Sequence, residues 1–163
     1  MNQKDRPATE VTICLILNGH PPTHILLGLK KTGLGCGKYV GPGGKVEPGE
    51  IPEEAAIREV REEIDISIDS KNLKYVGELT FEFPSKPEWN ELAHVFLARE
   101  WIGDPVETPE LQPFWFSIGE IPYEKMWDDY RFWLPEAIEG QNITARFVYS
   151  PDNQTVASMI TGV

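Results

Sequence analysis

Short apolar runs alternate with turns rich in Gly and Pro along most of the chain. Runs rich in Val, Ile, Leu, Thr or aromatic residues predict strands over residues 11–17, 25–30, 73–83 and 92–101, a short strand near residues 114–116, and two closing strands over residues 143–149 and 155–160. A turn over residues 18–22 joins the first two runs, and a Ser-Pro-Asp-Asn-Gln turn joins the last two. The pattern therefore predicts a hairpin near each end of the chain.

Two segments have the spacing of helices. Pro52 is well placed to begin a helix that runs to about Ile64, with Val60 and Ile64 on its apolar stripe. A second helix is expected from about residue 129 to residue 138. Because strands outnumber helices and no repeat or linker interrupts the 163 residues, we expect one α/β domain over residues 1–163, in which a mixed sheet is covered on its faces.

The acidic composition limits the classes of partner. Fifteen Lys and Arg against 26 Asp and Glu give a formal net charge of −11, which disfavours a nucleic acid polymer because its phosphates would be repelled. The longest uninterrupted apolar run, residues 13–17, is far shorter than the roughly 20 residues of a membrane helix, and residues 1–10 are too polar for a signal peptide. We therefore expect a cytoplasmic protein without a membrane partner, with Cys14 buried and both Cys14 and Cys36 reduced.

Candidate chemistry begins in a glycine-rich loop. Residues 31–44 contain six glycines, a composition that suits close approach of the backbone to a ligand. In the helix that follows, Glu59, Glu62 and Glu63 stand at spacings of three and four, so their carboxylates share one face. For an isolated helix this is typical of a solvated face paired with Arg58 and Arg61. Next to the glycine-rich turn, the same hard oxygen ligands suit Mg²⁺ or Mn²⁺.

The spacing of these residues resembles a known motif. Gly44, five residues, Glu50, seven residues, and then Arg58-Glu59-Val60-Arg61-Glu62-Glu63-Ile64-Asp65-Ile66 resembles the Nudix box, and eight of its nine defined positions match. The one departure is Asp65, which replaces a Gly at the end of the helix, where a left-handed conformation is common. Since Asp tolerates that conformation better than most residues, we expect local strain without loss of activity.

The likeness extends over about residues 11–138. Lys30-Lys31, Phe81-Glu82-Phe83, His94-Val95-Phe96, Pro113-Phe114-Trp115-Phe116 and Met126-Trp127 are similar to the oxidised-purine nucleoside triphosphatase branch of the Nudix family, the MutT homologues. This resemblance implies an α/β/α sandwich with a catalytic loop-helix-loop. It also implies Mg²⁺-dependent hydrolysis, with Mn²⁺ as a possible substitute, of triphosphates such as 8-oxo-dGTP to the monophosphate and pyrophosphate.

By the same resemblance, Glu59 and Glu63 are the main metal ligands, Glu62 assists, and a backbone carbonyl of Gly43 or Gly44 completes the set. Arg58 is expected to hold Glu50 or one of the box glutamates by a charge-assisted bond. Lys45 is expected to meet phosphate. The general base lies either in the box or on a later loop, where Glu110 matches an additional catalytic or metal-binding Glu.

The nucleobase is expected between Phe81, Phe83 and Trp127, with Thr12 also in the substrate site. Alternating Phe residues on a strand are equally typical of a core. The polar residues that read the base are only partly kept: Val40 occupies the position of an Asn, Asp129 matches the first of two Asp, and Tyr130 matches the second.

Two further interpretations stay open. Because Val40 cannot make the hydrogen bonds of an amide, the substrate is either an oxidised purine deoxynucleotide, another (d)NTP, or a nucleoside diphosphate derivative such as ADP-ribose. A non-catalytic nucleotide-binding domain is the other alternative, and the intact box residues argue against it. The sequence is compatible with a monomer or a small homo-oligomer.

Overall fold

The structure, a computed structural model, describes residues 8–162 and contains one mixed sheet. The strands follow the order β3-β2-β1-β5-β4-β7-β8, and β6 pairs with β2. β1 pairs with β5 in parallel, as does β4 with β7, and the other pairs are antiparallel. Their bounds are β1 Thr9–Asn18, β2 His24–Lys30, β3 Tyr39–Val40, β4 Leu73–Glu82, β5 Glu91–Ala98, β6 Leu111–Ser117, β7 Ile143–Tyr149 and β8 Val156–Thr161.

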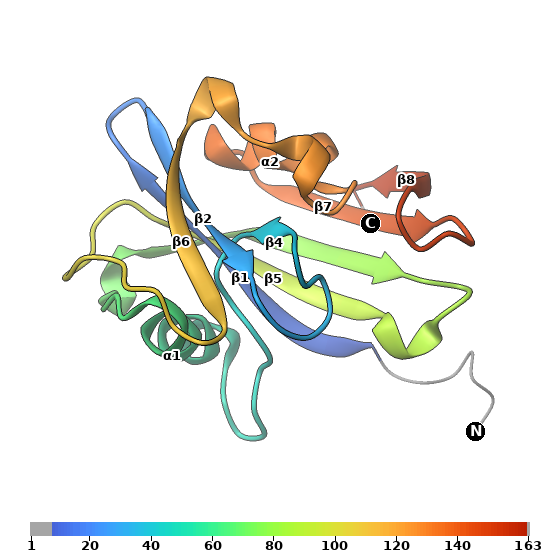
Figure 1. Ribbon diagram of the computed structural model, residues 1–163, viewed down its shortest axis with the longest axis horizontal. Helices are drawn as coiled ribbons and strands as arrows, with labels where there is room; N and C mark the ends of the chain where they lie inside the picture. Colours follow the sequence, from blue (N-terminus) through green and yellow to red (C-terminus); the bar gives the residue numbers. More distant parts are fainter. Residues whose placement is uncertain (1–7, 163) are drawn as a thin grey trace.

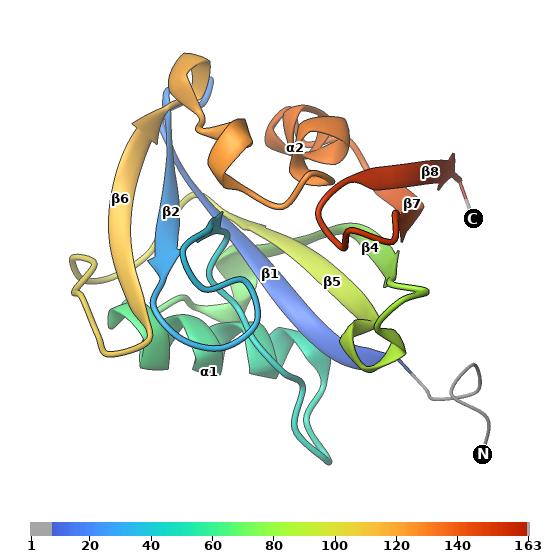
Figure 2. The same ribbon diagram turned by 45° about the vertical axis from the view of Figure 1, so that its right-hand side comes forward.

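Two α-helices cover opposite faces of this sheet (Figure 1 and Figure 2). They are α1 (Pro52–Ile64) and α2 (Tyr130–Ile138). Within residues 8–162, four single-turn 3₁₀ helices lie in the connections: η2 Ser70–Asn72, η3 Pro87–Trp89, η4 Ile118–Glu120 and η5 Tyr123–Lys125. The result is the three-layer α/β/α sandwich that the sequence predicts.

The alternation of side chains along β1 divides the core into two layers. Cys14 and Ile16 pack against α1, whereas Leu15 and Leu17 belong to the larger cluster that includes α2 and β7. All four side chains are fully buried. A central strand that is buried on both faces therefore forms a rigid base for whatever residues lie at its N-terminal end.

The structure confirms both predicted hairpins and corrects several boundaries. β6 is a full strand rather than a short one, because it pairs along the whole length of β2. The strand predicted over residues 92–101 begins at Glu91 and ends at Ala98. Helix α2 begins at Tyr130, and Asp129 precedes it as the cap position. Cys14 is buried and Cys36 is exposed, and both are free thiols. Among the described residues, no helix has the length and apolar character needed to cross a membrane.

Asp65 adopts the backbone conformation expected of the residue that ends α1. Its φ of 58° and ψ of 36° lie in the left-handed region, and its backbone N–H donates to the carbonyl of Arg61. The Arg61 guanidinium lies 3.1 Å from the Asp65 carboxylate. The box therefore keeps its helix C-terminus although Asp replaces Gly there.

Candidate active site

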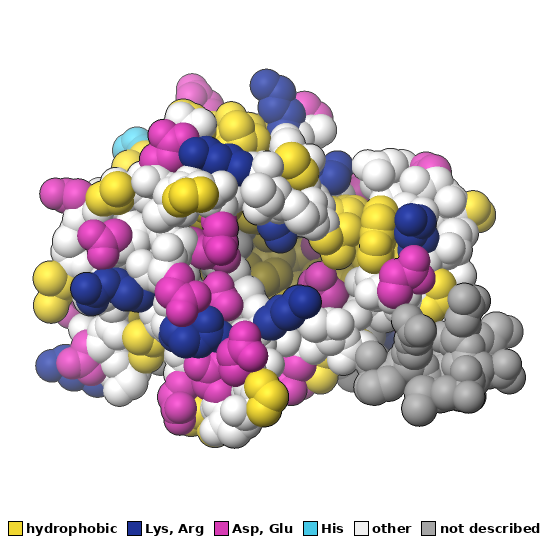
Figure 3. Space-filling model, turned by 60° about the horizontal axis from the view of Figure 1, so that its bottom comes forward, with side chains coloured by type: hydrophobic (Ala, Val, Ile, Leu, Met, Phe, Trp, Pro, Cys, Tyr) yellow, Lys and Arg dark blue, Asp and Glu magenta, His cyan; other side chains and the backbone are white. Residues whose placement is uncertain are grey.

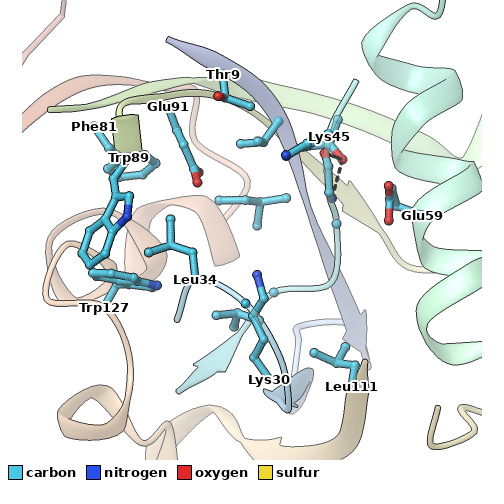
Figure 4. A pocket seen from close by; sticks show the side chains of 18 of the residues that line it. Thr9, Lys30, Leu34, Lys45, Glu59, Phe81, Trp89, Glu91, Leu111 and Trp127 are labelled. Carbon is cyan, nitrogen blue, oxygen red and sulfur yellow. Dashed lines mark hydrogen bonds between the residues drawn. The ribbon is translucent and has the colours of Figure 1, made fainter. Parts of the chain in front are cut away.

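A cavity of about 700 Å³ lies between β1, the glycine-rich loop, α1 and the segment that precedes α2. Figure 3 shows a hollow with hydrophobic side chains on its floor and charged side chains around its mouth. In Figure 4, Glu59 and Lys45 lie on one side, and Phe81, Trp89 and Trp127 form a wall on the other. The cavity therefore joins a charged end, suited to phosphates and cations, to an aromatic end suited to a planar ring.

Helix α1 presents Glu59 and Glu63 to the charged end. Val60 and Ile64 are fully buried against the sheet, which leaves positions 59 and 63 at the edge of the packed face, beside the cavity. Burial, followed by the charge of Glu59, raises the pKa of Glu63 to about 8. Burial also raises the pKa of Glu59. A cation bound between these groups would stabilise the ionised form of both.

Arg58 organises the acidic side chains around it. Its Nε donates to Oε2 of Glu50 at 2.7 Å, and its Nη1 donates to Oε1 of Glu59 at 3.0 Å and to Oε2 of Glu62 at 3.1 Å. Its Nη2 donates to the backbone carbonyl of Lys45 at 2.9 Å and to Oε1 of Glu50 at 3.0 Å. The Arg58 bond lowers the pKa of Glu50 to about 2. Arg58 thus ties the helix to the loop before it, and Glu50 acts on the site through Arg58.

The turn at Gly43 and Gly44 fits closely against β1 and α1. The Thr12 hydroxyl lies 3.3 Å from both the N–H and the carbonyl of Gly44, so it holds the turn in place. A Cβ on Gly43 would overlap the carbonyl oxygen of Thr12. A Cβ on Gly44 would lie 2.5 Å from Oε2 and 2.7 Å from Oε1 of Glu59. Only glycine lets the backbone of this turn approach the Glu59 carboxylate.

The donors at the charged end fit a hard divalent cation. Carboxylates of Glu59 and Glu63 and the backbone carbonyl of Gly43 are oxygen ligands of the kind that Mg²⁺ and Mn²⁺ take. The carbonyl of Gly44 already accepts a bond from the Thr12 N–H at 2.8 Å, which makes Gly43 the stronger candidate of the two. Within residues 8–162, no group of three or more His, Cys, Asp or Glu side chains is gathered in a way that would hold a metal ion.

The position of Glu62 explains why the three expected carboxylates are not gathered at one point. Its side chain is 57% exposed and bonds to Arg58, whereas that of Glu59 is only 13% exposed. Glu62 lies outside the cavity that Glu59 and Glu63 line. The structure therefore brings two of the three expected carboxylates to the cavity and leaves Glu62 on the outer side of Arg58.

Four other expected residues line the same cavity: Thr12, Val40, Lys45 and Glu110. Glu110 stands on the loop before β6, and its negative charge acts on both Glu59 and Glu63. The hydroxyl of Thr108, on the same loop, donates to the backbone carbonyl of Glu63 at 2.7 Å, so the loop is fixed to the end of α1. Lys30 also lines the cavity, and Figure 4 shows its side chain beside Leu34.

The aromatic end is built from residues that are both core and cavity wall. Phe81 and Phe83 are 7% and 4% exposed, belong to the larger hydrophobic cluster and also line the cavity. Phe83 stacks on Tyr149 with ring centroids 4.5 Å apart and meets Trp89 and Trp127 edge-on, each at 5.7 Å. Phe81 and Phe83 are therefore core residues that also form part of the cavity wall, and their contact with a nucleobase stays a prediction.

Asp129 lines the cavity, but its carboxylate is already bonded. The indole Nε1 of Trp133 donates to Oδ2 at 2.7 Å, and the Tyr149 hydroxyl donates to Oδ1 in a short bond. Burial raises the pKa of Asp129 to about 6 in spite of these bonds. The Tyr130 hydroxyl accepts from the backbone N–H of Gly41 at 3.0 Å. Both residues at the expected Asp positions are thus engaged within the protein.

Sequence reasoning missed two residues of the aromatic end, Trp89 and Glu91. Trp89 lies in η3, and Glu91 begins β5, one residue before the predicted strand. Because side chains alternate between the two faces of a strand, extending the predicted strand back from Ala93 and Val95 would have placed Glu91 on the same face as these two residues. A lone Glu at a strand end gives no other signal.

A model of the NUDIX domain matches residues 7–137. The chain is 37% identical to the oxidized purine nucleoside triphosphate hydrolase of Mus musculus over 147 residues, 90% of each chain. It is also 37% identical to the protein of that name from Danio rerio over 139 residues, 85% of each chain.

Solved structures agree on the fold. A MutT protein from Bacillus halodurans superposes with a TM-score of 0.80 at 24% identity, covering 94% of this chain and 97% of that one. A MutT protein from Methanosarcina mazei Go1 gives 0.68 at 26% identity, covering 83% and 96%. Because the family model spans residues 7–137 and Gly44, Glu59 and Glu63 of the box line one cavity, the chain belongs to the Nudix hydrolase family.

Proposed function

We propose that this protein is a metal-dependent nucleoside triphosphate pyrophosphohydrolase that converts oxidised purine deoxynucleoside triphosphates, such as 8-oxo-dGTP, to the monophosphate and pyrophosphate. The observation that carries the proposal is that one cavity joins an aromatic wall to the box carboxylates, with Lys30 and Lys45 also lining it. Two relatives that match over 85% or more of this chain are named for oxidised purine nucleoside triphosphates.

The orientation of the substrate follows from the charges. A purine stacks among Phe81, Phe83, Trp89 and Trp127, an interaction of about 1 to 3 kcal/mol per stacked base that does not depend on which base it is. The triphosphate then extends towards Lys45 and Glu59 at the other side of the cavity (Figure 4). Stacking supplies affinity at one end, and the chemistry takes place at the other.

The charged end needs a cation, since the protein carries a net charge of −11 and the substrate is an anion. Glu59, Glu63 and the Gly43 carbonyl would hold it. The chemistry that Mg²⁺ supplies when bound is neutralisation of the phosphates and polarisation of the attacking water. Arg58 keeps Glu59 in place through its Nη1 bond, and the backbone of the glycine turn lies close against that carboxylate.

Proton removal from the attacking water requires a carboxylate that is not committed to Arg58. Glu110 stands at the rim of the cavity, and its side chain makes no hydrogen bond or ion pair within the described part of the chain. Glu63 is the candidate within the box. A pH-rate profile of Glu110→Gln separates them: loss of the acidic limb assigns the base to Glu110, and an unchanged limb assigns it to Glu63.

Hydrolysis of a panel of nucleotides tests the proposed function, measured as pyrophosphate released from each triphosphate and as AMP released from ADP-ribose. The panel contains 8-oxo-dGTP, dGTP, 8-oxo-dATP, dATP and ADP-ribose, each with Mg²⁺, with Mn²⁺ and with chelator. We expect metal-dependent turnover with preference for an oxidised purine triphosphate. Turnover of ADP-ribose alone would reassign the substrate, and nucleotide binding without turnover would indicate a non-catalytic domain.

A further inference from the structure

The aromatic end contains a partly buried acidic side chain that the proposed chemistry does not use, Glu91; Glu88 also lines the cavity but is exposed. In the register of the sheet, Glu91 lies directly between Thr9 of β1 and Phe81 of β4, and register partners point to the same face. Figure 4 shows its carboxylate directed into the cavity, next to Phe81 and Trp89 and well away from Glu59. Glu91 therefore faces the ring of a bound nucleotide rather than the phosphates.

The carboxylate of Glu91 has no partner in the protein. Within residues 8–162, its oxygens make no hydrogen bond and no ion pair, and the charges of Lys30 and Lys45 act on it only from a distance. Burial raises the pKa of Glu91 to about 7. A half-buried carboxylate without hydrogen bonds is costly for a folded protein, because its desolvation is not compensated. A ligand with N–H donors would compensate it.

The two residues at the expected base-reading Asp positions already form hydrogen bonds within the protein. Both oxygens of Asp129 accept bonds from Trp133 and Tyr149, and the Tyr130 hydroxyl accepts from Gly41. Val40 has no polar group in its side chain. Discrimination between bases requires a polar group that can bond to the base edge, because stacking does not choose among them. Of the two cavity carboxylates beside Trp89 that make no bond within residues 8–162, Glu88 is exposed to solvent, whereas Glu91 is partly buried and can bond to the base edge.

The chemistry of a carboxylate selects the kind of base. Two acceptor oxygens match a base edge that presents two adjacent donors, as the N1–H and 2-amino group of guanine do. Adenine presents one donor, its 6-amino group, and one acceptor, N1, at the same edge, and the acceptor would meet a carboxylate oxygen. Oxidation at position 8 of the purine ring does not change these donors and acceptors of guanine or of adenine.

We propose that Glu91 is the specificity-determining residue of this site, and that its carboxylate accepts two hydrogen bonds from the N1–H and 2-amino donors of a guanine-type base. The proposal rests on the proposed function for the orientation of the nucleotide. It goes beyond that function because it assigns the choice between guanine and adenine to a residue outside the Nudix box and outside the expected base-reading positions.

The test replaces one of the two acceptor oxygens of residue 91 by an NH2 donor and keeps the size of the side chain. Glu91→Gln presents one donor and one acceptor, the pair that adenine complements. We expect wild type to favour 8-oxo-dGTP over 8-oxo-dATP, and dGTP over dATP, in kcat/KM. In Glu91→Gln that ratio should shift towards adenine by about 10- to 100-fold, the range of one bidentate base contact. Glu91→Leu should lose the guanine preference without gaining adenine.

Glu10→Gln is the matched control. Glu10 pairs with Leu92, the residue after Glu91, but its side chain bonds to His94 and does not line the cavity. It should keep the wild-type ratio. An unchanged ratio in Glu91→Gln, or an equal fall for both bases, would overturn the proposal, because a merely structural residue would affect both bases alike.

Binding of monophosphates separates this proposal from the proposed function. Calorimetry with 8-oxo-dGMP and 8-oxo-dAMP, without metal, measures base selection with no hydrolysis. If no nucleotide is hydrolysed, the proposed function fails, yet the ratio of the two affinities in wild type and Glu91→Gln still decides the role of Glu91. Thermal unfolding of each variant shows that it is folded, and Glu91→Leu provides the second variant should Glu91→Gln be unstable.

Discussion

Substituting Gly44 by Ala tests the geometry of the glycine turn. The added Cβ would lie 2.5 Å and 2.7 Å from the two oxygens of Glu59, whereas ordinary contact begins at 3.4 Å. The carboxylate must therefore retreat by about 1 Å, and its 3.0 Å bond from Arg58 is stretched or lost. A misplacement of about 1 Å near the chemistry costs about 100-fold in rate.

The folded state should tolerate the same change. Gly44 does not have a positive φ, so Ala fits its backbone conformation. Loss of an ion pair of the Arg58–Glu59 type costs about 0 to 1 kcal/mol, which corresponds to a shift in melting temperature of at most about 2 to 4 °C. We therefore expect Gly44→Ala to remain folded and to lose about 100-fold in kcat/KM for pyrophosphate release.

Gly119→Ala is the control, because a Cβ there would have no atom within 4 Å. Steady-state kinetics with saturating Mg²⁺, beside thermal unfolding of both variants, gives the comparison. If Gly44→Ala keeps activity within about threefold of wild type, Glu59 does not need the position that the turn gives it, and the argument for the charged end is wrong.

Three further predictions concern the aromatic end. Trp127→Ala should weaken nucleotide binding by about 1 to 3 kcal/mol for every base alike, seen as a rise in Kd without a change in base preference. Asp129→Asn should lower the free energy of unfolding by about 1 to 3 kcal/mol, measured with denaturant, because an amide cannot accept from both Trp133 and Tyr149; unchanged stability would contradict this. Since the pKa of Glu91 is raised from 4.5 to about 7, the folded state keeps a proton that the unfolded chain loses, so this group lowers stability increasingly as pH rises from about 4.5 to 7. Glu91→Gln should therefore melt above wild type near pH 8 and level with it near pH 4, and equal melting temperatures at both pH values would count against the burial of this carboxyl.

The charged end of the site can be predicted from the sequence because its residues lie close together along the chain. Glu59 and Glu63 lie one turn apart on a helix whose apolar stripe is visible in the sequence, and Gly44 precedes that helix by a short loop. The periodicity of a helix fixes which side chains share a face. What periodicity does not fix is the side-chain conformation of Glu62, which Arg58 draws outward.

The aromatic end is assembled from distant segments, and the sequence is less informative there. Glu91 becomes a neighbour of Thr9 and Phe81 only through the pairing of β5 with β1 and β4. Asp129 can be aligned to an expected base reader, yet its hydrogen bond from Tyr149 depends on how β7 packs beside α2. Pairing of strands and occupancy of hydrogen bonds are tertiary properties, so the sequence identifies Asp129 as a candidate base reader but does not show that Trp133 and Tyr149 already donate to its carboxylate.

The most direct test of the central claim is pyrophosphate release from 8-oxo-dGTP by wild type and by Glu63→Gln, with Mg²⁺ and with chelator. We expect turnover in wild type that depends on the metal, and a loss of about 100-fold or more in Glu63→Gln without unfolding. Turnover that persists in chelator, or a Glu63→Gln variant as active as wild type, would contradict it.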